Sequence, residues 1–386
     1  VFGNAMLLSP HIRLLAAFDH RHIFLDPSPN AAKSFRERKR IYDLPRSSWD
    51  DYDRKLLSKG GGVHSRHDKT IALSPEARAM LGIDAASASP VAIMRSLLKL
   101  PVDLLWNGGI GTYVKSTGET HAEIGDRSND ALRVNGGELR CRVIGEGGNL
   151  GFSQRGRIEY AMAGGRINTD FIDNSGGVNC SDVEVNLKIL FAPLMESGQL
   201  TRAARNRLLA RMTEEVGQLV LRNNYLQCLA ISGLQARAVE RIFELGHVIR
   251  ALERAGTLDR ALEALPTDDD IVERHRKGQG LTRPELSMLL SYSKIWLSGK
   301  LIETDIAEVR AMNRVSAERK LVTQLGTQAA SGFGDRLAVH VMRQKMLGKI
   351  TRLVLCSNRP NAIETYRLPG PRPAQGAPAP DHLNWD

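Results

Sequence analysis

The stretch VDLLWNGGIGTYVK, residues 102–115, runs an apolar segment directly into a glycine-rich turn that carries Asn107. The same order recurs in LRCRVIGEGGNLGFSQRG at 139–156 and in GRINTDFIDNSGGV at 165–178. An apolar strand, a glycine turn and then a helix form the repeating unit of open α/β sheets, which present their ligand-binding loops at the carboxyl ends of the strands. The three stretches therefore predict an α/β fold with its turns along one edge.

The turns share a residue type as well as a position. Asn107, Asn149 and Asn174 each offer a donor and an acceptor, while glycines such as Gly148 let backbone approach a ligand closely. A single Asn-Gly turn is usually only a turn. Three of them, each following an apolar stretch, predict one shared site.

The stretch IDNSGGVNCSDVEVN, residues 172–186, combines two demands on the backbone. Gly176 and Gly177 predict a sharp turn, and Ser181 followed by Glu184 has the pattern of a capping box that starts a helix. A helix start exposes unpaired N–H groups that attract an anion. Capping boxes also occur where nothing binds, so a purely structural turn is the alternative. The alternation of apolar residues over 183–189 would also suit a strand, but the wider spacing favours a helix.

The N-terminal segment predicts a buried strand. Residues 12–27 contain the apolar run Leu14–Phe18, which is typical of a strand in a parallel sheet and ends on Asp19. In a dinucleotide-binding βαβ unit an acidic residue at this position accepts hydrogen bonds from a ribose 2′-OH. The alternative is that Asp19 only caps a turn.

The chain beyond residue 195 has the spacing of helices. Thr282 and Glu285 form a second capping box with Pro284 in the first turn. The final residues are rich in Pro, Gly and Ala and have little to bury. We therefore predict an α/β, Rossmann-like dinucleotide-binding domain at 1–195 that lacks its first strand and glycine loop, a helical domain at 196–350 and a disordered tail at 351–386.

Composition narrows the class of protein. The 386 residues are 42% hydrophobic and 25% charged, which is ordinary for a soluble globular protein, and no apolar run approaches the ~20 residues of a membrane span. The net charge of +10 is spread among acidic residues along helix-like segments, which favours solvated surface over nucleic-acid binding. Four scattered cysteines predict neither disulfides nor a metal site and suit a cytoplasmic protein.

Three motifs carry a family resemblance. WNGGIGTYVK at 106–115, GEGGNLGFSQRGRIEYA at 145–161 and GRINTDFIDNSGGVNCSDVEVNLKIL at 165–190 closely resemble the large bacterial NAD-specific glutamate dehydrogenases. VFGNAMLLSPHIRLLAAFDHRHIFLDP at 1–27 and GLTRPELSMLLSYSKI at 280–295 resemble the same family. The resemblance covers about residues 1–303, and from about Asp305 the sequence departs from the family by divergence or by a shifted reading frame.

The resemblance implies oxidative deamination of L-glutamate to 2-oxoglutarate and ammonium with NAD as hydride acceptor. It implies that Asn149, with Gly148 beside it, contacts the nicotinamide ribose region, with Asn107 close by. It implies that Asn174 lies at the nicotinamide end of the cofactor and that Ser181 binds the side-chain carboxylate of the substrate. Asp19 would take the adenosine ribose and favour NAD over NADP.

The resemblance also sets expectations about the whole protein. The family's phosphate-binding loop and its catalytic lysines and aspartate should precede Val1, so we expect this chain to be the carboxyl-terminal part of a larger homo-oligomeric enzyme, without catalytic residues of its own and inactive alone. The hypothesis from another class is a non-catalytic nucleotide-binding module that serves regulation or assembly. Retention of Ser181, which such a module would not need, favours the enzyme.

Overall fold

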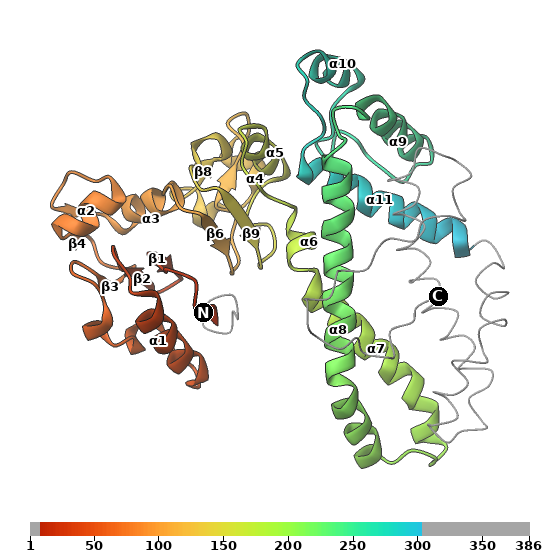
Figure 1. Ribbon diagram of the computed structural model, residues 1–386, viewed down its shortest axis with the longest axis horizontal. Coiled ribbons are helices and arrows are strands. Elements are labelled where there is room, and N and C mark those ends of the chain that lie inside the picture. The colour runs from red at the N-terminus through yellow and green to blue at the C-terminus, as the bar shows by residue number, and fades with distance from the viewer. Residues whose placement is uncertain (1–7, 303–386) are drawn as a thin grey trace, which may run out of the picture.

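The computed structural model describes residues 8–302, where a part of mixed strands and helices is followed by a part made of helices (Figure 1). The strands are β1 (Ala16–Phe18), β2 (His22–Leu25), β3 (Gly62–Ser65), β4 (Ile71–Ala72), β5 (Ser87–Ala88), β6 (Leu104–Asn107), β7 (Val114–Lys115), β8 (Val134–Asn135) and β9 (Val143–Glu146). The helices are α1 (Ala31–Asp43), α2 (Pro75–Leu81), α3 (Pro90–Leu98), α4 (His121–Ile124), α5 (Gln154–Met162), α6 (Asp170–Asp173), α7 (Ser175–Glu196), α8 (Arg202–Gln235), α9 (Ile242–Arg254), α10 (Asp268–Arg276) and α11 (Arg283–Ile302).

The N-terminal strands form an antiparallel sheet in the order β1-β2-β3. We predicted a single buried parallel strand within residues 12–27, and that prediction is wrong. The chain turns at Asp19, whose Oδ1 accepts hydrogen bonds from the backbone N–H groups of Arg21 and His22 at 2.7 Å each. Because this carboxylate closes a hairpin, β2 pairs back onto β1 instead of continuing it.

Two short parallel pairs lie in the middle of the mixed part. Strand β6 pairs with β9 and β7 pairs with β8, both in parallel register. These strands confirm the mixed α/β class and the first two predicted strand-and-turn stretches. The third stretch contributes only an isolated parallel bridge from Arg166 to Val143, because it passes at once into α6. Asn107 and Glu146 are directly paired at the carboxyl ends of β6 and β9.

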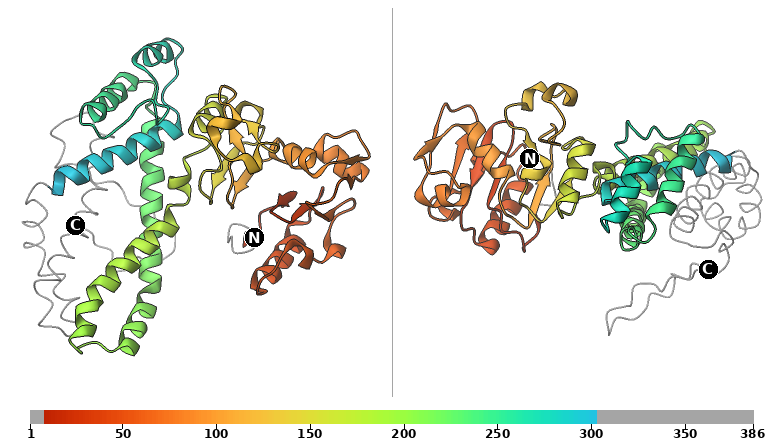
Figure 2. Two further views of the ribbon diagram at one scale, coloured as in Figure 1. Left: turned by 180° about the vertical axis from the view of Figure 1, so that it is seen from behind. Right: turned by 90° about the horizontal axis from the view of Figure 1, so that it is seen from above.

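The helical part packs around one apolar core. Helices α7 and α8 form a long antiparallel hairpin that extends away from the strands, and α9, α10 and α11 cluster at the other end of α8 (Figures 1 and 2). Ile231, Leu286 and Leu289 are fully buried in this core, which also receives Ile172 from α6. The predicted cap at 282–285 is confirmed, since the backbone N–H and hydroxyl of Thr282 both donate to Glu285 Oε2 at 2.7 Å.

Helix α7 differs from its prediction at its beginning. It begins at Ser175, so Gly176 and Gly177 lie in its first turn and Ser181 lies seven residues beyond Asn174. Ser181 therefore does not cap the helix, and the predicted capping box with Glu184 is wrong. Instead Glu184 pairs with Lys188 one turn further along, at 2.5 Å. The sharp turn predicted at Gly176 and Gly177 is wrong as well, since both are helical, and neither position requires glycine because a Cβ there would meet no neighbour closer than 3.7 Å.

Across residues 8–302, no helix combines the length and the apolar character needed to cross a membrane.

Candidate functional site

Two loops at the carboxyl ends of β6 and β9 are joined by their backbones. We call residues 107–112 and 147–151 the tip loops. The N–H groups of Gly147 and Gly148 donate to the carbonyl of Asn107 at 2.8 and 3.1 Å, and the Thr112 hydroxyl donates to the carbonyl of Leu150 at 2.7 Å. These bonds fix one loop against the other at both ends.

Glycine is required at two contacts between the tip loops. A Cβ on Gly148 would lie 2.0 Å from the carbonyl oxygen of Gly109, and a Cβ on Gly151 would lie 1.6 Å from Nδ2 of Asn107. Both distances are far below any van der Waals contact. The structure thus explains these glycines by the close crossing of the loops, whereas the sequence explained them by approach to a ligand.

Asn174 joins the third turn to the tip loops. Its Nδ2 donates to the side-chain oxygen of Asn149 at 2.5 Å and to the carbonyl of Gly148 at 3.2 Å. Asn107, Gly148, Asn149 and Asn174 therefore come together, as the sequence predicts. We call these four residues the asparagine cluster.

Two other predicted site residues stand apart. The carboxylate of Asp19 is occupied by its own hairpin turn in the antiparallel sheet. Ser181 is exposed and about 10 Å along the axis of α7 from Asn174, at a rise of ~1.5 Å per residue. Asn174 precedes α7 with non-helical backbone angles, so Ser181 is separate from the asparagine cluster.

A buried ion network lies directly beneath the asparagine cluster. Arg157 on α5 makes two hydrogen bonds to the carboxylate of Glu146 at the end of β9, at 2.7 and 3.0 Å, and lies 3.4 Å from Asp170. Asp170 accepts from the backbone N–H of Leu150 at 2.8 Å, and Asp173 accepts from that of Glu146 at 3.0 Å. The network thus fixes the backbone that carries Asn149.

Burial governs the electrostatics of this network. Glu146 is fully buried, and desolvation raises its pKa to about 7 against the opposing effect of Arg157. Burial also raises the pKa of Asp173, while its hydrogen bond from Asn168 opposes the shift. A buried charge is costly unless it is paired, so these groups depend on each other.

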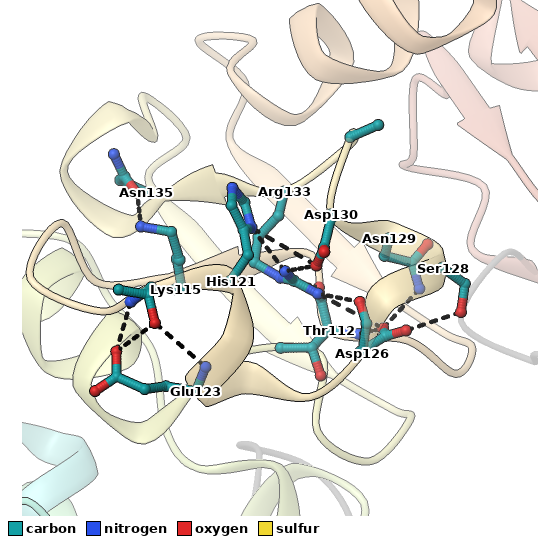
Figure 3. A network of polar contacts seen from close by, with 12 residues as sticks. Thr112, Lys115, His121, Glu123, Asp126, Ser128, Asn129, Asp130, Arg133 and Asn135 are labelled. Atoms are coloured by element: carbon teal, nitrogen blue, oxygen red, sulfur yellow. Dashed lines mark hydrogen bonds and ion pairs between the residues drawn. The ribbon is translucent and has the colours of Figure 1, made fainter.

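A second network anchors the other side of the tip loops (Figure 3). Arg133 is 2% exposed and its Nε donates to the carbonyl of Thr112 at 2.9 Å. Its other nitrogens reach Asp130 at 2.5 Å and the carbonyl of Asp126 at 2.6 Å. The Asp126 carboxylate in turn accepts from the backbone N–H of Thr112 at 2.8 Å. The residue that ends the first tip loop is therefore held from both sides.

Sequence reasoning missed both networks. Arg157, Glu146 and Arg133 are charged residues in polar-looking segments, and nothing in their spacing distinguishes them from solvated surface. The available signal was the pair Asp170 and Asp173, which stand on one helical face next to a glycine turn. Among the described residues, no group of three or more His, Cys, Asp or Glu side chains could hold a metal ion.

Known proteins match this chain over most of its length. Residues 1–234 match the family described as bacterial NAD-glutamate dehydrogenase, catalytic domain, and residues 278–349 match the glutamate dehydrogenase C-terminal family. The chain belongs to the bacterial NAD-glutamate dehydrogenase family. The asparagine cluster lies within the catalytic-domain match, and the cap at 282–285 lies within the C-terminal match.

Relatives within this family share about half of their aligned residues with the chain. The NAD-specific glutamate dehydrogenase of Pseudomonas aeruginosa is 52% identical over 347 residues, and that of Mycobacterium tuberculosis is 51% identical over 353 residues. Each alignment covers 90% of this chain and 21% of the relative. Similarity was predicted to end near Asp305, and that prediction is wrong, since the C-terminal match continues to residue 349.

Proposed function

We propose that this chain supplies the nicotinamide-binding edge of an enzyme that oxidatively deaminates L-glutamate to 2-oxoglutarate and ammonium, with NAD as hydride acceptor. The observation that carries the proposal is the hydrogen bond between the Asn149 and Asn174 side chains, beside the carboxyl ends of the parallel strands β6 and β9 where Asn107 lies, in a chain of this family. Ligands of open α/β sheets bind at such an edge.

The residues present fit the polar end of NAD. Nδ2 of Asn107 is buried without a hydrogen-bond partner among the described residues, although buried donors are nearly always paired. Asn149 and Asn174 add two amide groups that are hydrogen-bonded to each other. We assign Asn107, Gly148, Asn149 and Asn174 to the cofactor, which would supply the hydride acceptor when bound.

Ser181 is the residue we assign to the glutamate side-chain carboxylate. Ser181 lies within α7 rather than at its beginning, so the unpaired N–H groups of a helix start do not assist it. The hydroxyl is exposed about two helical turns beyond Asn174, and a serine hydroxyl can donate to a carboxylate. Asp19 keeps its proposed contact with the adenosine ribose on the family resemblance alone.

We also propose how the chain is divided into domains. We assign residues 1–195 to the Rossmann-like cofactor domain and residues 196–350 to the helical domain. Residues 1–7, residues 303–350 and the tail at 351–386 lie outside the described residues. We also keep cytoplasmic location and homo-oligomeric assembly of the whole enzyme as proposals.

A chimeric enzyme tests the proposed function. This chain would replace the 347-residue segment that it matches in the Pseudomonas aeruginosa relative, and glutamate-dependent NADH formation would be measured. We expect turnover with the unaltered chain and a loss of about a hundredfold or more with Asn174→Ala, a scale typical of removing one well-placed polar group from a reaction centre. A folded chimera that binds NADH without turnover would favour the regulatory module instead.

A further inference from the structure

Leu150 has a backbone conformation that its residue type rarely adopts. Its φ is +57°, and within residues 8–302 only Arg46 and Ala264 share this left-handed geometry without being glycine. For a residue with a Cβ the conformation is sterically costly. Such strain persists only where the surroundings over-determine it, and it clusters at functional sites.

The surroundings of Leu150 hold both of its peptide groups. Its N–H donates to Asp170 at 2.8 Å, and Asp170 is itself paired with Arg157. Its carbonyl accepts from the hydroxyl of Thr112, which the second network fixes in turn (Figure 3). Two buried networks therefore converge on this one residue and keep it in place.

The strained residue exposes a large apolar side chain. Leu150 is 66% exposed, and Ile110 on the adjoining tip loop is 89% exposed, the highest value for a large apolar side chain in the described part. Both flank the asparagine cluster, and Leu150 directly follows Asn149. Apolar exposure is unfavourable in the free protein, and a bound ligand that covers these two side chains would remove it.

We propose that Leu150 and Ile110 form an apolar lip that packs against the nicotinamide ring of the cofactor. The inference rests on the proposed function. A flat heterocycle with a polar amide edge needs polar partners at the edge and apolar partners at its faces. The asparagine cluster offers the first and the lip offers the second.

Substitutions at Leu150 separate the side chain from the backbone strain. Asn and Gly both tolerate the left-handed conformation, and neither supplies an apolar contact. In the chimeric enzyme we expect Leu150→Asn and Leu150→Gly to weaken NADH binding about tenfold in a fluorescence titration, with an unchanged or higher melting temperature. Leu150→Met keeps an apolar side chain and is expected to bind within about twofold of the unaltered protein.

Two residues of the helical part provide matched controls. Ala264→Gly relieves the same kind of strain, and Leu262→Asn removes an apolar side chain that is 76% exposed. Both are expected to leave NADH affinity unchanged. They show how much of any change in NADH affinity or melting temperature arises from relieving backbone strain or from replacing an exposed apolar side chain, at a position away from the tip loops.

The outcomes distinguish this inference from the proposed function. If Leu150→Asn and Leu150→Gly bind NADH as tightly as the unaltered chimera, the lip is overturned, whatever the turnover. An apolar lip that instead contacts another protein segment would lower the melting temperature of these variants and leave NADH affinity unchanged. If the unaltered chimera binds NADH without turnover, the proposed function fails and the comparison at Leu150 still decides the lip. A folded chimera that does not bind NADH overturns both.

Discussion

The tip-loop region and the helical region are held together by different forces. Beneath the asparagine cluster, charged side chains from β9, α5 and α6 are buried against one another. In the helical region the interior is a continuous set of Leu, Ile and Ala side chains from α8 to α11. Directional polar contacts fix atoms in place, whereas apolar packing fixes mainly the distance between helices. The region that must present defined amide groups uses the first kind of contact.

The largest expected effect is at the centre of the ion network. Arg157→Met removes the partner of a fully buried Glu146, so we expect a loss of about 4 kcal/mol in the free energy of unfolding. Urea denaturation of the chain measures it. In the helical region, Lys277→Met breaks a pair whose side chains are 59% and 61% exposed, and should change stability by less than about 0.5 kcal/mol. Equal losses for the two variants would remove the distinction between the regions.

A cavity in the helical core should affect stability alone. Leu289 is fully buried, and Leu289→Ala is expected to cost about 3 kcal/mol of unfolding free energy. The core comes nearest to the asparagine cluster at Ile172 on α6, whereas Leu289 lies on α11, so NADH affinity of the folded chimera should be unchanged. A parallel loss of NADH affinity would show that the two regions are coupled.

Titration of one carboxylate in each region should change the free energy of unfolding with opposite signs as pH rises. The raised pKa of Glu146, about 7, means that the folded state keeps this proton while the unfolded state releases it, so its contribution lowers stability as pH rises from about 4.5 to 7. The unfolding free energy of the unaltered chain should therefore fall by up to about 1.4 kcal/mol per pH unit in that window because of Glu146, and Glu146→Gln should abolish this part of the pH dependence. In the helical region, hydrogen bonds from Thr267 lower the pKa of Asp270. The stability that ionised Asp270 contributes to the folded state is therefore lost as pH falls below about 3.8.

Unfolding free energies of Glu146→Gln and Asp270→Asn, measured from pH 3 to 8, check both signs. A Glu146→Gln curve parallel to that of the unaltered chain between about pH 4.5 and 7 would contradict the burial of an ionisable group at this position.

The smallest effect concerns the substrate. Ser181→Ala in the chimera should raise the KM for glutamate about fivefold, the equivalent of ~1 kcal/mol for one hydrogen bond, with the KM for NAD unchanged. Asn186→Ala on the same helix is the control, since its side chain donates only to the carbonyl of Asp182 at 2.9 Å. Equal changes in both KM values would overturn the role of Ser181.

Sequence reasoning succeeded where a local pattern has one physical outcome. The pair Thr282 and Glu285 predicted a helix start because reciprocal bonds to backbone N–H groups favour it, and α11 begins there. The rule that carboxyl ends of parallel strands meet at one edge accounts for Asn107 and Asn149, whereas Asn174 reaches Asn149 from the junction of α6 and α7. Ser181 and Glu184 have the same pattern as the first pair, but the helix already starts at Ser175 and leaves Ser181 no free N–H to cap.

Other features depend on contacts between distant segments. Asp19 follows an apolar run in either a parallel strand or a hairpin, and only the pairing of β2 with β1 distinguishes them. Arg157 lies eleven residues from Glu146, and the ion pair requires β9 and α5 to be placed first. The left-handed conformation of Leu150 likewise results from Asp170 and Thr112, which no local pattern around 150 predicts.

We propose that Asn107, Asn149 and Asn174 surround the nicotinamide of NAD. An electron cryomicroscopy structure of the chimeric enzyme with NAD and glutamate would locate the cofactor. We expect the nicotinamide amide to lie within hydrogen-bonding distance of at least one of these side chains. A cofactor bound elsewhere, with all three asparagines free of ligand contact, would show that this assignment is wrong.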